Sequence, residues 1–140
     1  MKTITICGKE YTISCNAFTR FQYKKVFGKG IFEDLKVLQN FAEKQEKIRA
    51  ELTEKKCSEE EITQAINSYM MEKFDDFLDV VEKMAYILIL TANDKFESFE
   101  NWLKGIEKID ISEDWIGEVT EFAVSSFRWW WANSSDSQIT

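Results

Sequence analysis

Residues 84–92, which read Met-Ala-Tyr-Ile-Leu-Ile-Leu-Thr-Ala, form the stretch that most constrains the fold. Apolar residues occupy every side of a helical wheel there, so we expect a helix that is buried all round. The run continues a helical apolar pattern that begins near Ile62 and stops at the polar triplet Asn93-Asp94-Lys95. The pattern therefore predicts one long helix at the centre of the fold.

That helix raises a problem of length. About 34 residues at 1.5 Å each would make roughly 50 Å of helix, which is longer than a compact domain of this size is wide. Either its N-terminal end pairs with the preceding segment as a helical hairpin, or it kinks, and we expect the hairpin. The inward positions are expected to be Ile62, Ala65, Ile66, Tyr69, Met70, Phe74, Phe77, Val81, Met84, Ala85 and Leu88.

The composition agrees with long helices. The 140 residues include no proline and only five glycines, whereas average usage would give about seven prolines. We therefore predict a mainly α fold with an N-terminal β-hairpin, a small helical bundle built around the one long central helix. We expect a single domain over residues 1–131 and a disordered polar tail over residues 132–140.

The hairpin is predicted for Lys2–Ser14, where apolar and polar residues alternate. Gly8 can supply the positive φ that a tight turn needs, with either Cys7-Gly8 or Gly8-Lys9 as the turn pair. The two registers place the same four residues on one face, which we expect to pack on helices because an isolated hairpin is marginally stable. These residues are Ile4, Ile6, Tyr11 and Ile13.

Two helical segments follow the hairpin. Asn16 can cap a helix that runs to about Phe27, with Gly28 at its C-terminal stop. Its broad apolar surface is formed by Phe18, Phe21, Val26 and Phe27. In the next segment Ile31, Leu35, Leu38 and Ala42 repeat at helical spacing.

Residues 43–57 differ in character, because only three of them between Glu43 and Lys56 are apolar. Favourable i,i+4 charge pairs support a helix there, so we predict an exposed helical arm. The segment Ser58-Glu59-Glu60-Glu61 has the pattern of a capping box and opens the long helix.

Two further helices are predicted after the polar break. Ser98 has the position of an N-cap before a short amphipathic helix with Phe99, Trp102 and Leu103 on its apolar side. Ser112 has the same position before a last helix. The core stripe of this last helix is expected to contain Ile116, Val119, Ala123, Phe127 and Trp130.

Charge and cysteine content narrow the function classes. The net charge is −7 and the pI about 4.8. Lys and Arg appear interleaved with Glu, and without a basic stripe we expect no nucleic-acid partner. The three cysteines show no metal-ligand spacing, and their odd number suits a reducing cytoplasm. The longest apolar run is far shorter than the roughly 20 residues that cross a bilayer, so no membrane is expected.

Catalysis is not expected either. The chain has no histidine, no Gly-x-Gly-x-x-Gly motif and no phosphate loop, so we predict neither an enzyme nor a cofactor. Asp75, Asp76, Asp79 and Glu82 could place carboxylates on one side of a helix for a divalent ion. A solvated helix face is the preferred interpretation, because no second acidic helix is predicted to point at the same spot.

The triplet Trp129-Trp130-Trp131 is the clearest candidate for a binding surface. Successive helical residues differ by about 100°, so three in a row cannot all face one small core. Since Trp130 continues the inward stripe, we assign Trp129 and Trp131, together with Phe127, to a protein-binding surface. A terminal cap folded over the domain edge and a homo-oligomer contact are the competing uses of the same residues.

The order of these elements resembles the tail assembly chaperones of long-tailed phages and prophages of Gram-positive bacteria. The resemblance covers most of the chain, although residues 43–56 and the Trp triplet depart from the family pattern. The matching pieces are Ile6-Cys7-Gly8-Lys9-Glu10-Tyr11, Met84-Ala85-Tyr86 through Ala92-Asn93-Asp94, Ser98-Phe99-Glu100-Asn101-Trp102-Leu103, and Ile116–Phe127.

The resemblance implies a function without an active site. Such a protein would bind the long helical tape measure protein, keep it soluble and promote assembly of the tail tube around it, with the tail tube protein as a second partner. It would act in the bacterial host cytoplasm and be missing from the mature virion. The alternative is a small acidic helical adaptor or inhibitor, such as a DNA mimic, whose binding would weaken steeply with salt.

Overall fold

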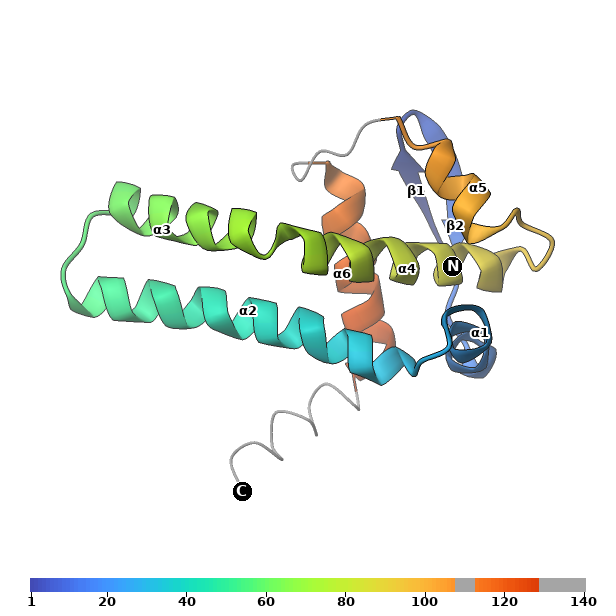
Figure 1. Cartoon of the computed structure of the whole chain (residues 1–140), viewed down its shortest axis with the longest axis horizontal. Helices are drawn as coiled ribbons and strands as arrows, with labels where there is room; N and C mark the ends of the chain where they lie inside the picture. The colour runs from blue at the N-terminus through green and yellow to red at the C-terminus, as the bar shows by residue number, and fades with distance from the viewer. Residues whose placement is uncertain (108–112, 129–140) are drawn as a thin grey trace, which may run out of the picture. The chain divides into compact units, whose positions relative to one another are not determined.

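The computed structural model describes residues 1–107 and 113–128, and these residues form one β-hairpin followed by six helices (Figure 1). The predicted mainly α fold with an N-terminal hairpin is confirmed. The elements are β1 (Lys2–Ile6), β2 (Lys9–Ile13), α1 (Ala17–Phe27), α2 (Ile31–Glu54), α3 (Glu59–Glu72), α4 (Phe74–Ala92), α5 (Phe99–Lys104) and α6 (Asp114–Ser126).

The chain divides into two compact units. One comprises Met1–Gly30 with Val81–Thr140, and the other comprises Ile31–Val80. The hairpin, α1, α5, α6 and most of α4 belong to the first unit, whereas α2 and α3 belong to the second. The single domain predicted for residues 1–131 stays a prediction.

The hairpin pairs β1 antiparallel to β2, with Ile6 opposite Lys9. The turn pair is therefore Cys7-Gly8, and both residues have positive φ, 50° and 80°. Positive φ at both turn residues matches the twist of the two strands. The same conformation is strained for Cys7, which has a Cβ atom. The expected inward face is present, with Tyr11 half-buried and the other three residues buried: Ile4, Ile6 and Ile13.

The core of the first unit forms around the second half of α4. Every residue from Met84 to Ile89 is buried, which confirms the predicted burial on all sides for this part of the run, whereas Leu90, Thr91 and Ala92 are half-buried. The hairpin is tied to the same helix, because the Ser14 N–H donates to the Leu88 carbonyl at 3.1 Å. On α6 the buried residues are Trp115, Ile116, Val119 and Ala123.

Tyr86 on α4 stands at the centre of an aromatic cluster. Its ring lies 5.3–6.2 Å, centroid to centroid, from four other rings. These rings belong to Phe27, Phe96, Phe99 and Trp102. Its hydroxyl donates to the Glu97 carbonyl at 2.7 Å. Burial, and secondarily the nearby Glu97 charge, raises the pKa of Tyr86.

The cluster also fixes α5 and the hairpin. Ser98 caps α5 as predicted, since its side chain accepts from the Asn101 N–H. Trp102 is buried at 2% exposure, and its ring meets that of Tyr11 edge-on at 6.5 Å. Residues from five segments of the first unit thus share one aromatic core.

In the second unit α2 and α3 form an antiparallel helical hairpin (Figure 1), as expected from the length argument. Its turn combines two caps. Lys56 takes the left-handed conformation with φ of 62°, and the Cys57 N–H bonds the Leu52 carbonyl, which makes a Schellman stop. Ser58 and Glu61 then form the predicted capping box. Away from this turn, Phe41 of α2 stacks on Phe77 at the start of α4, with ring centroids 4.5 Å apart.

Three expectations about the helices need correction. The long helix is present as α3 and α4, interrupted at Lys73 alone, and the hydrogen-bond ladder continues because the Phe77 N–H bonds the Lys73 carbonyl. On α2 the inward stripe turns to Phe41, and Ala42 is exposed. The N-cap of α6 is Glu113, without a side-chain cap bond, and Ser112 lies outside the described residues.

We predict that Trp102→Ala lowers the free energy of unfolding by about 3–5 kcal/mol, because it opens a cavity at the centre of the aromatic cluster. The indole N–H has no acceptor among the described residues, so the loss would reflect packing alone. Thermal and urea unfolding measure it. Met71→Ala, at a side chain that is 81% exposed on α3, is the control and should change stability by about 0.5 kcal/mol or less. Equal stability of the two variants would contradict the burial of Trp102.

We predict faster amide exchange in Glu43–Lys56 than in Met84–Leu90. Most side chains of the former segment are exposed, whereas the latter is enclosed, so local opening costs less in the arm. Hydrogen–deuterium exchange read by mass spectrometry on the whole chain measures the difference. Equal protection of the two segments would show that the arm is held as firmly as the core.

Candidate functional site: the outer face of α1

Two of the three residues predicted to bind a partner, Trp129 and Trp131, lie outside the described residues, as does Trp130. Phe127 is half-buried and forms the C-cap of α6, where its N–H bonds the Ala123 carbonyl. The triplet assignment therefore stays a prediction. Among the described residues, the clearest candidate surface lies on α1.

The inner face of α1 is polar. Its buried residues are Thr19, Gln22 and Tyr23, at the i, i+3, i+4 spacing of one helical face. The Thr19 hydroxyl lies 3.0 Å from that of Thr91 on α4, and the Thr91 hydroxyl donates to the Ile87 carbonyl at 2.8 Å. Gln22 Oε1 lies 3.3 Å from the same Thr91 oxygen. Buried polar groups are costly when unpaired, so these bonds fix which side of α1 faces α4.

Both ends of α1 are also secured. Asn16 accepts from the Phe18 N–H at 2.8 Å, while its own N–H donates to Thr19 Oγ1 at 3.0 Å. At the other end Gly28 adopts the left-handed conformation with φ of 76° and bonds the Lys24 carbonyl. Phe27, which is half-buried, packs against the buried Tyr23 at 4.9 Å and against the aromatic cluster.

The outer face of α1 consequently exposes aromatic rings. Phe18 is 53% and Phe21 57% exposed, and the two rings stack at 5.4 Å with an interplanar angle of 19°. Val26 is exposed as well, in the last turn of the helix, although it lies on the same side as Thr19 and Gln22. The broad apolar surface expected for this helix is thus divided, with Phe27 against the aromatic cluster and most of the rest on the surface. Exposed apolar pairs on a rigid element are typical of protein-binding sites.

The same face is basic. The residues Ala17–Phe27 include Arg20, Lys24 and Lys25, all exposed, and no acid. The rest of the chain therefore carries −10, since α1 contributes +3 to the total of −7. This local basic run was not predicted, because over the chain as a whole Lys and Arg are interleaved with acids. We define the outer face of α1 as Phe18, Arg20, Phe21, Lys24 and Lys25.

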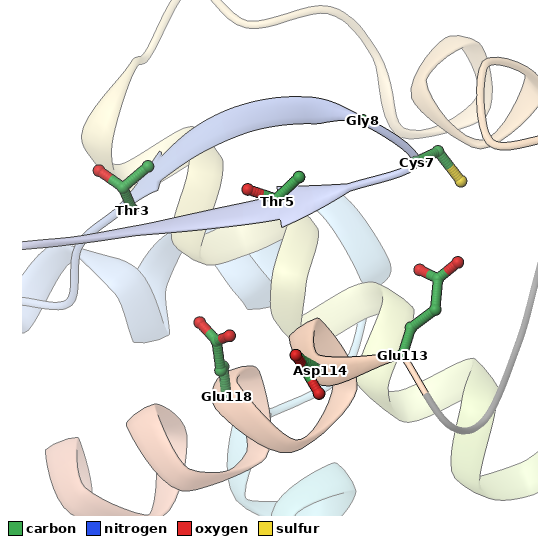
Figure 2. A pocket seen from close by; sticks show the side chains of 7 residues that line it. All are labelled: Thr3, Thr5, Cys7, Gly8, Glu113, Asp114 and Glu118. Carbon is green, nitrogen blue, oxygen red and sulfur yellow. The ribbon is translucent and has the colours of Figure 1, made fainter.

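A hollow with a volume of about 530 Å³ lies between the hairpin turn and the start of α6. Figure 2 shows the hairpin residues on one side and the carboxylates of α6 on the other. Acids at a helix N-terminus are stabilised by the helix dipole, which accounts for their position without a ligand. Glu118 is also paired with Lys2 at 3.7 Å. The lining residues are Thr3, Thr5, Cys7, Gly8, Glu113, Asp114 and Glu118.

The acids considered for a divalent ion lie on α4, with Asp75, Asp76 and Asp79 exposed and Glu82 half-buried. Within residues 1–107 and 113–128, no three potential metal ligands gather at one point. In the same part of the chain, no helix combines the length and apolarity needed to span a bilayer.

Comparison with known proteins gave no match of the chain to a protein-family model, to a curated protein or to a solved structure.

We predict that Thr91→Val lowers the free energy of unfolding by about 1–3 kcal/mol, because it leaves buried Thr19 and Gln22 without their partner on α4. Thr120→Val on α6 is the matched control. Its hydroxyl also bonds the carbonyl four residues earlier, that of Ile116, and this bond lies within a single helix. Chemical denaturation compares the two. A loss of equal size in both variants would show that the link between α1 and α4 contributes nothing.

Proposed function

We propose that this chain is a phage tail assembly chaperone, which binds the tape measure protein, keeps it soluble and promotes assembly of the tail tube. The observation that carries the proposal is the stacked pair Phe18 and Phe21, held outward on a helix whose opposite face is fixed by hydrogen bonds. The resemblance of the sequence to this family supplies the identity of the partner. The chaperone would act in the host cytoplasm before the tail polymerises and would be missing from the mature virion.

The physical requirements of the role support the proposal. A tape measure protein is a long helical chain that exposes apolar stripes until the tube encloses it. A chaperone must cover such stripes and still remain in solution. Aromatic side chains on a rigid helix provide the first property, since they bury large areas at little conformational cost. A net charge of −7 provides the second.

The adaptor or DNA-mimic alternative would need a different surface. A mimic of nucleic acid presents carboxylates to a basic partner, whereas the outer face of α1 presents cations and aromatic rings. This face therefore favours the chaperone over the mimic. The tail tube protein remains a proposed second partner.

We predict that Phe18→Ser with Phe21→Ser reduces the yield of soluble tape measure protein several-fold in co-expression, because the variant loses the aromatic contact area. The two side chains contribute little to the core, so the melting temperature should stay close to that of the parent chain. Recovery of the complex by affinity purification of the chaperone measures the effect.

Two further variants sharpen this experiment. Met71→Ser removes another exposed apolar side chain, on α3, and should leave recovery unchanged. Trp129→Ser with Trp131→Ser tests the surface expected from the sequence. If the parent chain fails to increase the solubility of the tape measure protein at all, the proposed function is wrong. If only the Trp variant loses the complex, the function stands and the binding face is the triplet.

A further inference from the structure

We infer that the outer face of α1 binds an amphipathic helix that carries acidic residues beside its apolar stripe. The inference rests on the proposed function in that the tape measure protein would supply this helix. It adds the chemistry of the segment that is recognised and the residues that recognise it.

The layout of the outer face specifies the partner. At 100° per residue, Lys25 continues the row of Phe18 and Phe21, while Arg20 and Lys24 form a second row about 110° further round the outer side of the helix. An apolar stripe can therefore lie on the two rings. A flank of Glu or Asp can then reach the row of Arg20 and Lys24, where opposite charges attract across the edge of the contact.

The extent of the face sets the strength of the contact. The 11 residues of α1 span about 16 Å, which matches roughly three turns of a partner helix. Two aromatic side chains with a basic border cover far less than the roughly 800 Å² per partner of a stable complex. Each contact would therefore be weak and reversible, which suits a chaperone that must release its client to the tube.

The charges argue against two other occupants. A two-fold contact between α1 helices of two copies would bring the same patch against itself, so that six cations would meet. An anionic membrane would attract the three cations of α1, but the rest of the chain carries −10 and would be repelled. An acidic helix of another protein satisfies both the rings and the cations.

A pair of synthetic peptides tests this inference by isothermal titration with the full chain. Both peptides are helical and share one leucine stripe, and they differ only in having Glu or Lys at the flanking positions. The parent chain should bind the Glu peptide about tenfold more tightly. Which peptide binds more tightly is informative, because the chain's net charge of −7 alone would favour the Lys peptide.

Charge reversal on α1 should reverse the preference. Arg20→Glu with Lys24→Glu is expected to bind the Lys peptide more tightly than the Glu peptide. Lys36→Glu with Lys44→Glu changes two exposed cations of α2 by the same amount and should keep the preference of the parent chain. Equal binding of the two peptides by the parent chain, no binding of either, or reversal by the α2 variant would each overturn the inference.

Three companion measurements separate this inference from the proposed function. The two double variants of α1 are Phe18→Ser with Phe21→Ser and Arg20→Glu with Lys24→Glu. If the tape measure protein binds both of them as well as it binds the parent chain, the inference is wrong and the function stands. If the parent chain ignores the tape measure protein but prefers the Glu peptide, the function is wrong and the α1 face serves another acidic helix. Sedimentation of the parent chain should give no dimer that depends on α1, and phosphatidylglycerol vesicles should not retain it. A dimer that depends on α1 would assign the face to a second copy, and retention by the vesicles would assign it to a lipid surface.

Discussion

The first unit depends on the position of Tyr86. Its ring contacts aromatic partners from three places, namely α1, α5 and the break that separates α4 from α5. Its hydroxyl holds the backbone of the same break through Glu97. A tyrosine is suited to this position because it fills the core with a large ring and its hydroxyl can donate to the Glu97 carbonyl at the edge of that core. The short helix α5 has too few residues to be stable alone and is held in place by these contacts.

Local signals in the sequence were sufficient for most element boundaries. Asn16, Ser58 and Ser98 all cap helices, and Gly28 ends one, because capping is decided by residues within one turn of each other. The enclosed run after Met84 was equally clear, since apolar residues on every side of a helix have no alternative to burial. The interruption at Lys73 had no such signal, because neither Gly nor Pro marks it.

The orientation of α1 could not be predicted from its own residues. A helix with several phenylalanines is expected to turn them inward, whereas α1 turns Thr19 and Gln22 toward Thr91, which lies 72 residues along the chain from Thr19. The sequence did contain two hints, namely the spacing of Thr19, Gln22 and Tyr23, and a threonine within an otherwise apolar run. The exposure of Phe18 and Phe21 in the proposed site was hard to predict for the same reason. Its rings lie opposite a face that bonds Thr91, a partner distant in the chain, and the spacing of Thr19, Gln22 and Tyr23 alone does not identify that partner.

The polar inner face of α1 also shapes the energy landscape of the chain. A helix with aromatic residues on one side and a hydrogen-bonding set on the other has two orientations that could pack on α4. Burial of apolar area would favour the rings inward, whereas the geometry of Thr91 favours the native orientation. The two preferences are in conflict, which is local frustration in the sense of folding theory. Natural proteins keep such conflicts mainly at functional sites, and the energetic cost of keeping Phe18 and Phe21 in water is the one that the proposed binding would relieve.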